Sequence, residues 1–151
     1  MRLRQATDAD DDFCLQLNIA TMREYIEPLY GWDIDEQRRL HVRYFEPERL
    51  LIIEDDNGAA IGLLEVSDNG DHLYVSRIEV RPEAQGHGVG TAVMDGLIRE
   101  GRTIRLRVFK NNVRARRFYE RLGFIVDHES DDEHHLSMHR ASEVSGESSV
   151  V

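Results

Sequence analysis

The sequence predicts a single-domain mixed α/β fold, in which a largely antiparallel sheet of about seven strands carries helices on both faces. Three observations lead to this prediction. Seven short apolar or alternating segments are separated by turn signals, two helical patterns fill the first third of the chain, and two more follow its middle. The 151 residues suffice for one core, which we place in residues 1–140, and we expect residues 141–151 to form a disordered tail.

The chain begins with a strand pattern that leads into a helix. Residues 2–6 alternate between polar and apolar types. Thr7 and Asp8 can cap the helix that follows, because their side-chain oxygens accept hydrogen bonds from free backbone N–H groups. Pro28 and Gly31 are expected to break this helix.

A second helix and three strands are expected next. Asp33 is a candidate N-cap for the helix, which should run through about Phe45. Asn57-Gly58 and Asn69-Gly70 are hairpin turn signals. They separate the three strands of an antiparallel meander, predicted over residues 50–54, 60–66 and 72–80.

The second half of the chain alternates helices and strands. Gly101 and Gly123 each follow a helical pattern, where a glycine commonly ends a helix. The elements expected here are a helix to about residue 100, a strand over 103–109, a helix over 111–122, and a hairpin of strands 124–129 and 134–140.

Composition limits the classes of function. The formal net charge of −10 argues against a nucleic-acid partner, which would require a basic surface. No run of 18 apolar residues exists, so we expect no membrane partner, and the first residues do not resemble a signal peptide. The single cysteine, Cys14, lies in an apolar helical pattern and is expected to fill the core. These features predict a cytoplasmic protein.

The stretch between residues 81 and 91 joins a predicted strand to a predicted helix. It contains Gly86, Gly88 and Gly90 at alternate positions. Glycine allows positive φ and close approach of a ligand to the backbone, and the helix that follows presents free N–H groups at its positive end. The junction therefore suggests a phosphate or pyrophosphate site, although neither the Walker A nor the dinucleotide-binding pattern is present. A tight turn without a ligand is the alternative.

A second motif narrows the choice of ligand. Residues 112–124 have the spacing N-x-x-A-x-x-F-Y-x-x-x-G-F, and residues 85–90 have the spacing Q-x-x-G-x-G. Together they resemble the GNAT superfamily of acetyl-CoA-dependent N-acetyltransferases, over about residues 72–126. The resemblance implies acetyl-CoA as cosubstrate and a central pair of strands that splay apart. It does not rest on the N-terminal third, which matches only in the order of its elements.

The resemblance also implies which residues bind acetyl-CoA. The pyrophosphate would be held mainly by backbone N–H groups of the glycine loop. The side chain of His87 has two equal interpretations, a contact with the phosphate or an exposed loop residue without a ligand. The pantetheine would lie along the preceding strand, and Asn112 would contact the cofactor unless it is simply a helix N-cap. The implied cofactor-binding residues are Ile78, Glu79, Val80, Gln85, Gly86, His87, Gly88, Val89, Gly90, Thr91 and Asn112.

Tyr119 matches the general acid of the family. A phenol, with a pKa of ~10, can protonate a leaving thiolate whose conjugate thiol has a pKa of ~8.5. The alternative is a packed aromatic residue, an interpretation that fits the neighbouring Phe118 better. The general base is less clear, because Arg107 occupies a position where some relatives carry glutamate. Glu79 is our candidate, and the alternatives are an outward-facing Glu79 paired with Arg77 or Arg107, or a chain of waters.

In this family, the first two helices and their connection usually wall the acceptor site. The aromatic and acidic residues there suit a small cationic amine or a peptide N-terminus, and packing of the helix junction is the alternative. The candidate acceptor-binding residues are Tyr25, Glu27, Tyr30 and Trp32. The histidines and aspartates of residues 128–135 fit no zinc spacing, so we expect no metal.

The predicted function is acetyl transfer from acetyl-CoA to a primary amine by direct attack through a tetrahedral intermediate. The alternative is a non-catalytic acyl-CoA-binding sensor or partner module. Homodimerisation is common in the family and is a further expectation.

Overall fold

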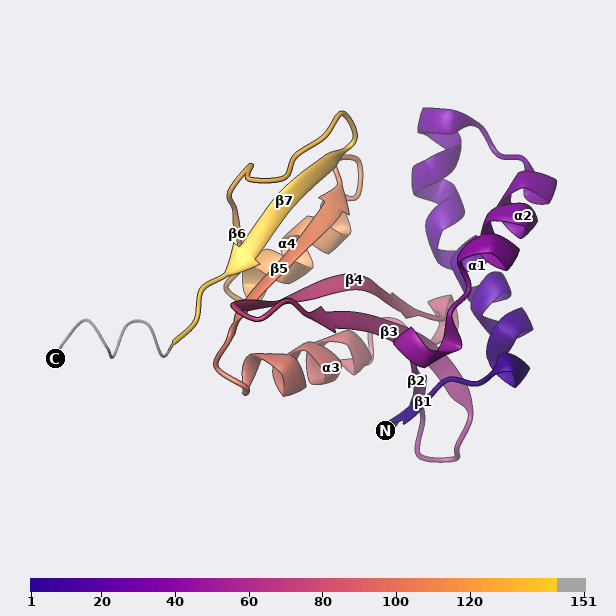
Figure 1. The fold of residues 1–151 in the computed structure, drawn as a ribbon, viewed down its shortest axis with the longest axis horizontal. Coiled ribbons are helices and arrows are strands. Elements are labelled where there is room, and N and C mark those ends of the chain that lie inside the picture. Colours follow the sequence, from indigo (N-terminus) through magenta and orange to yellow (C-terminus); the bar gives the residue numbers. More distant parts are fainter. Residues whose placement is uncertain (144–151) are drawn as a thin grey trace, which may run out of the picture. The chain divides into compact units, whose positions relative to one another are not determined.

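The computed structural model describes residues 1–143. These residues form two compact units, whose helices and strands are drawn in Figure 1. The first unit comprises Met1–Glu65 and Arg77–Gly90, and the second comprises Val66–Ser76 and the chain from Thr91 onward. Residues 144–151, most of the predicted disordered tail, lie outside the described residues. No helix within residues 1–143 is long and apolar enough to cross a membrane.

The first unit combines the N-terminal helices with one end of the sheet. Its short 3-10 helices are η1 (Asp8–Asp10), η2 (Pro47–Arg49) and η3 (Pro82–Ala84). Its other elements are β1 (Arg2–Gln5), α1 (Asp11–Tyr30), α2 (Ile34–Tyr44), β2 (Leu51–Glu54), most of β3 (Ala60–Asp68) and the end of β4 (His72–Val80).

Of the predicted N-caps in this unit, Thr7 and Asp33 are present, whereas Asp8 lies inside η1 rather than capping a helix. Thr7 and Asp10 form a capping box at η1, which continues into α1. The side chain of Asp33 accepts hydrogen bonds from the first turn of α2. The prediction that Pro28 breaks the first helix is wrong, because Pro28 lies inside α1. The helix ends at Gly31, which has a φ of 73°.

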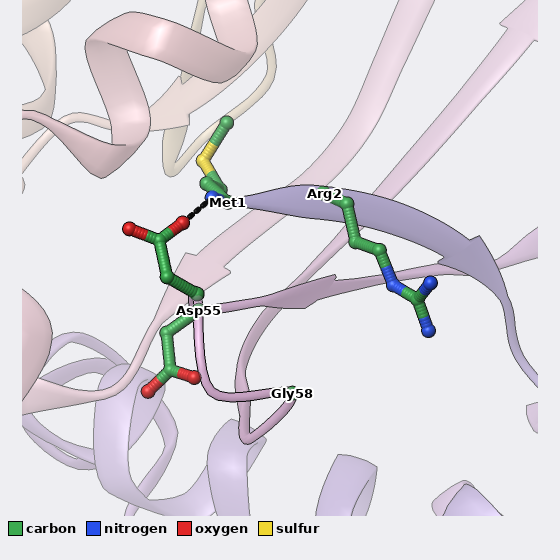
Figure 2. A pocket seen from close by; sticks show the side chains of 5 residues that line it. Met1, Arg2, Asp55 and Gly58 are labelled. Carbon is green, nitrogen blue, oxygen red and sulfur yellow. Dashed lines mark hydrogen bonds and ion pairs between the residues drawn. The ribbon is translucent and has the colours of Figure 1, made fainter.

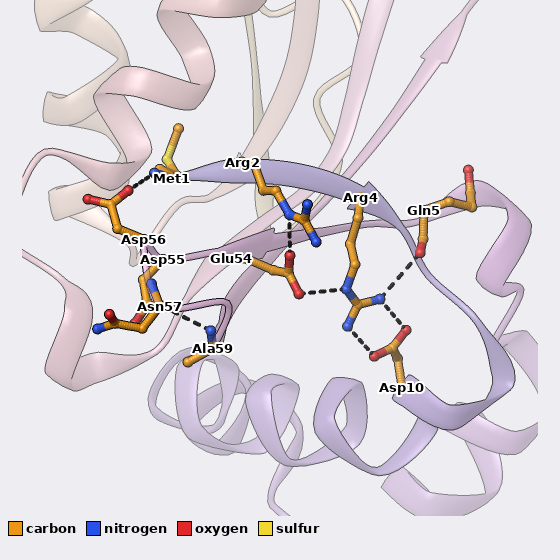
Figure 3. A network of polar contacts seen from close by, with 10 residues as sticks. All are labelled: Met1, Arg2, Arg4, Gln5, Asp10, Glu54, Asp55, Asp56, Asn57 and Ala59. Atoms are coloured by element: carbon orange, nitrogen blue, oxygen red, sulfur yellow. Dashed lines mark hydrogen bonds and ion pairs between the residues drawn. The ribbon is translucent and has the colours of Figure 1, made fainter.

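Strand β1 is joined to β2 by an ion-pair network as well as by backbone pairing (Figure 3). Arg4 donates from Nε to Glu54 at 2.8 Å and from its terminal nitrogens to Asp10 at 2.8 and 2.9 Å. Arg2 donates to the other oxygen of Glu54 at 2.7 Å. Hydrogen bonding by Arg4 lowers the pKa of the buried Asp10 carboxyl. The network fixes the start of the chain on the strand beside it.

Apolar side chains from α1 and two strands form the core of the first unit. The buried members are Ala6, Cys14, Leu17, Leu50, Ile52 and Leu63. Cys14 is fully buried, as predicted for a core residue. Strands β3 and β4 approach closely at Gly62, where a Cβ atom would lie 2.4 Å from the carbonyl oxygen of Glu79. Only glycine allows that approach.

The second unit holds the remaining helices and strands. They are most of α3 (Val89–Ile98), β5 (Thr103–Phe109), α4 (Val113–Arg121), β6 (Ile125–Val126) and β7 (His135–Arg140), with the start of β4. Gly101 and Gly123 follow α3 and α4 with φ values of 75° and 92°. The predicted hairpin forms, but its first strand is only two residues long. The carboxylate of Asp132 instead binds the backbone N–H groups of His134 and His135 in the loop.

The sheet has seven strands in the order β1-β2-β3-β4-β5-β7-β6. Most neighbours are antiparallel, but β4 pairs with β5 in parallel. That parallel pairing joins His72–Val75 to Thr103–Leu106, whereas β4 continues to Val80 and β5 to Phe109. The predicted mixed, largely antiparallel fold is confirmed, and the short ladder is where the sequence resemblance placed a splayed pair. The prediction of one domain over residues 1–140 stays a prediction.

Candidate functional site

The glycine loop is anchored to the end of β4. The side-chain amide of Gln85 donates to the carbonyl oxygen of Val80 at 2.8 Å. The backbone N–H of Gln85 also bonds to the carbonyl oxygens of Arg81 and Pro82, at 3.1 and 3.2 Å. These bonds hold the loop in place before its first glycine, so Gln85 has a structural role whether or not it contacts a ligand.

Two of the three glycines adopt a conformation that other residues avoid. The φ angles of Gly86 and Gly88 are 79° and 81°, and a Cβ atom on either would meet nothing within 4 Å. His87 is exposed between them. Gly90 lies in the first turn of α3. The loop is therefore open on its outer side and is shaped by backbone conformation rather than by packing.

Helix α3 follows the loop without interruption. Its first residues are Val89, Gly90 and Thr91, and their N–H groups have no carbonyl partner within a helix. The helix has ten residues, and its positive end adjoins the open loop. Free donors, positive potential and an accessible backbone together suit a phosphate group.

Strand β4 leads into this loop and carries the candidate base. Glu79 is only 6% exposed, whereas its neighbours Ile78 and Val80 are half-buried. Its Oε2 accepts a hydrogen bond from Nε of Arg77 at 2.7 Å, and its Oε1 lies 2.9 Å from the hydroxyl of Thr21 on α1. The interpretation of Glu79 as an outward-facing residue is wrong, but its predicted pairing with Arg77 is present.

The surroundings of Glu79 are polar but largely closed to solvent. Burial acts to lower the pKa of Arg77, but the charge and hydrogen bond of Glu79 outweigh it, so the pKa of Arg77 is raised. Burial raises the pKa of the nearby Cys14 thiol to about 11. The guanidinium is therefore a permanent cation, and the thiol is neutral at ordinary pH.

Thr21 is the residue of this group that sequence reasoning missed. Cys14, Leu17 and Thr21 follow one another at helical spacings of three and four residues, so they lie on the same face of α1. Cys14 and Leu17 are buried. The spacing could therefore have placed Thr21 on the inner face, although it could not have identified Glu79 as its partner.

The sequence resemblance places Arg107 at a position where some relatives carry glutamate. It lies on β5 and pairs with Asp132 at 2.9 Å. A pairing of Arg107 with Glu79, which was one alternative for Glu79, stays a prediction.

Tyr119 is buried on α4 with 7% of its surface exposed. Its ring makes edge contacts with Phe118 and Phe124, at centroid distances of 5.1 and 5.5 Å. Burial raises the pKa of Tyr119 well above its ordinary value, so the phenol keeps its proton at ordinary pH. The expectation that Phe118 is the better packed aromatic is wrong, because Phe118 is only half-buried.

Asn112 caps α4. Its side-chain oxygen accepts a hydrogen bond from the N–H of Ala115 at 3.0 Å. The N-cap interpretation is therefore confirmed, and a contact between Asn112 and a cofactor stays a prediction.

The candidate acceptor residues lie at the end of α1 and just after it. Glu27 forms an ion pair with Arg23 at 3.2 Å, and the Arg23 guanidinium lies 5.3 Å from the centroid of the Trp32 ring. Tyr30 is 64% exposed and Tyr25 is half-buried. Glu27 and Trp32, two of the four residues proposed to attract a cation, thus already face one that belongs to the chain itself.

Two other features do not contribute to this site. Figure 2 shows a pocket lined by Met1, Arg2, Asp55, Asp56 and Gly58, none of which is a predicted site residue. Within residues 1–143, no group of three or more histidine, cysteine or acidic side chains can hold a metal ion. The histidines near the C-terminal hairpin instead pair with acidic residues, as His139 does with Asp127 at 2.5 Å.

Comparisons with known proteins agree with these observations. A sequence model described as the acetyltransferase (GNAT) family matches residues 16–124. The chain is 36% identical over 123 residues to a mycothiol acetyltransferase of Kineococcus radiotolerans, covering 77% of this chain and 39% of that protein. It is 34% identical over 128 residues to a mycothiol acetyltransferase of Stackebrandtia nassauensis, covering 76% of this chain and 41% of that protein. The chain thus spans about two fifths of the length of these relatives.

A solved structure shows the same fold. The PaiA N-acetyltransferase of Thermoplasma acidophilum, in complex with coenzyme A, superposes with a TM-score of 0.72 at 14% identity, covering 93% of this chain and 98% of that one.

Proposed function

Because the chain belongs to the acetyltransferase (GNAT) family, we propose that it transfers an acetyl group from acetyl-CoA to a primary amine. The observation that carries this proposal is the open glycine loop that leads directly into the N-terminus of α3. A diphosphate needs several converging N–H donors and a backbone that it can approach closely, and this junction offers both.

The residues present fit acetyl-CoA. The pyrophosphate would be bound by backbone N–H groups from Gly86 to Thr91, with the Thr91 hydroxyl as a further donor. The pantetheine would lie along residues 78–80, which continue β4 beyond its parallel pairing with β5. In support, the PaiA structure that shares this fold is a complex with coenzyme A.

Two side chains are proposed to move protons. Glu79 would take a proton from the acceptor ammonium, which frees its nitrogen to attack the thioester carbonyl carbon. The C–N bond forms, the C–S bond breaks, and Tyr119 would protonate the departing thiolate. The buried phenol of Tyr119 holds its proton until the transfer, as a proton donor must, although its raised pKa makes it a weaker acid than an exposed phenol.

The proposed acceptor is a small cationic amine or a peptide N-terminus. Arg23 already occupies Glu27 and the face of Trp32, so an acceptor ammonium would have to displace its guanidinium. The names of the sequence relatives add a further candidate, the acceptor of the mycothiol acetyltransferases. Cytoplasmic localisation and homodimerisation stay predictions.

A second candidate function is an acyl-CoA sensor that does not catalyse transfer. The carboxylate of Glu79 is already paired with Arg77, and Arg107 stands where a glutamate is found in some relatives. Both observations weaken the case for an efficient base, and therefore for turnover.

One experiment separates the two functions. Coenzyme A release from acetyl-CoA would be measured with polyamines, amino acids, aminoglycosides, short peptides and the acceptor of the mycothiol acetyltransferases. Calorimetry would measure acetyl-CoA binding in parallel. Release with one acceptor class supports the transferase, and binding without release to any acceptor supports the sensor. Absence of binding would refute both.

The glycine loop has a matched control for the binding measurement. Gly88 and Gly58 have nearly equal φ angles of 81° and 82°, and a Cβ atom on either meets nothing within 4 Å. Alanine at either site therefore introduces the same backbone strain. Gly88→Ala should weaken acetyl-CoA binding about tenfold or more, because the loop relaxes away from its donor geometry, whereas Gly58→Ala should not. Equal affinities would contradict the proposed cradle.

A further inference from the structure

The hydroxyl of Thr21 lies between two acceptors. Its Oγ1 is 2.9 Å from Oε1 of Glu79 and 3.0 Å from the carbonyl oxygen of Leu17, one turn earlier in α1. The other carboxylate oxygen of Glu79 receives Nε–H from Arg77 at 2.7 Å. Each oxygen of this buried carboxylate therefore has one side-chain partner, and the two partners come from different elements.

The two partners differ in what they can do when Glu79 changes its protonation state. The Arg77 guanidinium can only donate a hydrogen bond. A hydroxyl can donate or accept, so Thr21 can donate to the ionised carboxylate. Once Oε1 carries a proton, Thr21 can accept that hydrogen bond and turn its own O–H toward the Leu17 carbonyl. No buried polar atom is left unpaired in either state.

We propose that Thr21 is a positioning residue that holds Glu79 in place before and after it takes the proton of the acceptor amine. This inference rests on the proposed function, because it assigns Thr21 a role through the candidate base. A carboxyl group that is 6% exposed cannot rely on water to satisfy its changing hydrogen-bond needs. A rotating hydroxyl supplies what water would otherwise supply.

Other titratable groups lie around Arg77 and Cys14. Glu65 on β3 and Cys14 on α1 act electrostatically on Arg77, and Asp10 and Asp11 act on Cys14. Around Glu79, Thr21 and Arg77 are its side-chain hydrogen-bond partners among the described residues. Of the two partners, Thr21 is the one that can change from hydrogen-bond donor to acceptor.

The position of Thr21 also ties the base to the acceptor side. Tyr25 lies four residues further along α1, on the same helix face as Thr21. Because Thr21 and Tyr25 share one helix, the bond from Thr21 to Glu79 links the candidate base on β4 to the helix that carries a candidate acceptor residue. Loss of the hydroxyl should therefore impair turnover more than binding of acetyl-CoA.

The test compares Thr21→Val, which keeps the shape and removes the hydroxyl, with Thr21→Ser, which keeps the hydroxyl. In Thr21→Val we expect kcat to fall about tenfold, with acetyl-CoA affinity unchanged. The acid limb of the pH–rate profile should move to higher pH by about half a unit or more, because a bond to the charged carboxylate is stronger than the neutral bonds that replace it. Thr21→Ser should restore both. An unmoved limb, or one moved to lower pH, would overturn the proposal.

A second measurement does not depend on turnover. The carboxyl ¹³C resonance of Glu79, assigned by its absence in Glu79→Gln, would be titrated in wild type and in Thr21→Val. A titration displaced to higher pH in Thr21→Val supports the positioning role even if no acceptor is acetylated, in which case the proposed function fails alone. Superimposable titrations in a folded variant overturn the role of Thr21 while leaving acetyl transfer intact.

Discussion

Gly62 marks the closest approach between β3 and β4, directly beside the candidate base. An alanine Cβ atom there would lie 2.4 Å from the carbonyl oxygen of Glu79 and 3.0 Å from Cδ1 of Ile53. Ordinary contact begins at about 3.4 Å, so the Glu79 carbonyl would have to move by about 1 Å. Ile53 can turn the end of its side chain away, but a backbone oxygen in a paired strand cannot move by itself.

This displacement sets the expected size of the effect. Overpacking of a buried site costs about 1–3 kcal/mol of unfolding free energy. For a chain of this length, each kcal/mol lowers the melting temperature by about 2–4 °C, so Gly62→Ala should melt roughly 2–12 °C below wild type. Because the displaced carbonyl belongs to Glu79, turnover should fall as well.

The assay is thermal and urea unfolding, with Gly96→Ala as the control. Gly96 lies in α3, and a Cβ atom there would meet nothing within 4 Å. Alanine is a better helix former than glycine, so Gly96→Ala should gain about 0.5–1 kcal/mol. If Gly62→Ala unfolds at the wild-type temperature while Gly96→Ala is stabilised, the argument from close approach is wrong.

Three further predictions concern single side chains. Tyr119→Phe should lower kcat about 10²-fold or more by removing the proton donor, with calorimetric acetyl-CoA affinity within a factor of two, and an unchanged kcat would exclude it as the acid. Burial raises the pKa of Cys14 from 9.0 to about 11, so its contribution to the free energy of unfolding should be complete below pH 9 and lost as pH rises to 11. The unfolding free energy of Cys14→Ala should therefore decline less steeply with pH over this range than that of wild type, and equal slopes would refute the prediction. Arg23→Gln should uncover Glu27 and Trp32 and lower KM for cationic acceptors about two- to fivefold, but not for neutral ones; an equal change for both would point to altered packing instead.

Local signals explain why much of the fold was predictable. Asp33 caps α2 and Gly101 and Gly123 follow α3 and α4 because these residues satisfy helix ends whatever surrounds them. The open loop at Gly86 and Gly88 is also a local feature, because glycine can adopt positive φ whatever surrounds it.

The error at Pro28 arises because a proline near the end of a helix does not have to stop it. Pro28 lacks an N–H, yet α1 continues past it to Tyr30, and the last turn is closed by a bond from Gly31 N–H to the Glu27 carbonyl oxygen. Because Pro28 lies so near the end of α1, its missing N–H removes a single backbone hydrogen bond from the helix.

The candidate site was predictable only in part because its side-chain contacts join residues that lie far apart in the sequence. The family resemblance selected Glu79 and Tyr119, but neither residue's surroundings follow from spacing. Thr21 lies 58 positions before Glu79, so only the folded chain shows that they bond. Likewise, Glu27 and Trp32 were predicted to bind a cation from outside, but in the folded chain both contact Arg23.

The burial of Cys14 has a practical consequence. It is the single cysteine of the chain, it is fully buried, and its thiol holds its proton at neutral pH. Because the thiolate is the form that reacts with disulfide reagents, the folded protein should react with them very slowly. Coenzyme A released in the reaction can then be followed continuously by its thiol without correction for the enzyme. A cysteine introduced at the exposed His87 would, in turn, be the one site labelled with a fluorophore to report ligand arrival at the glycine loop.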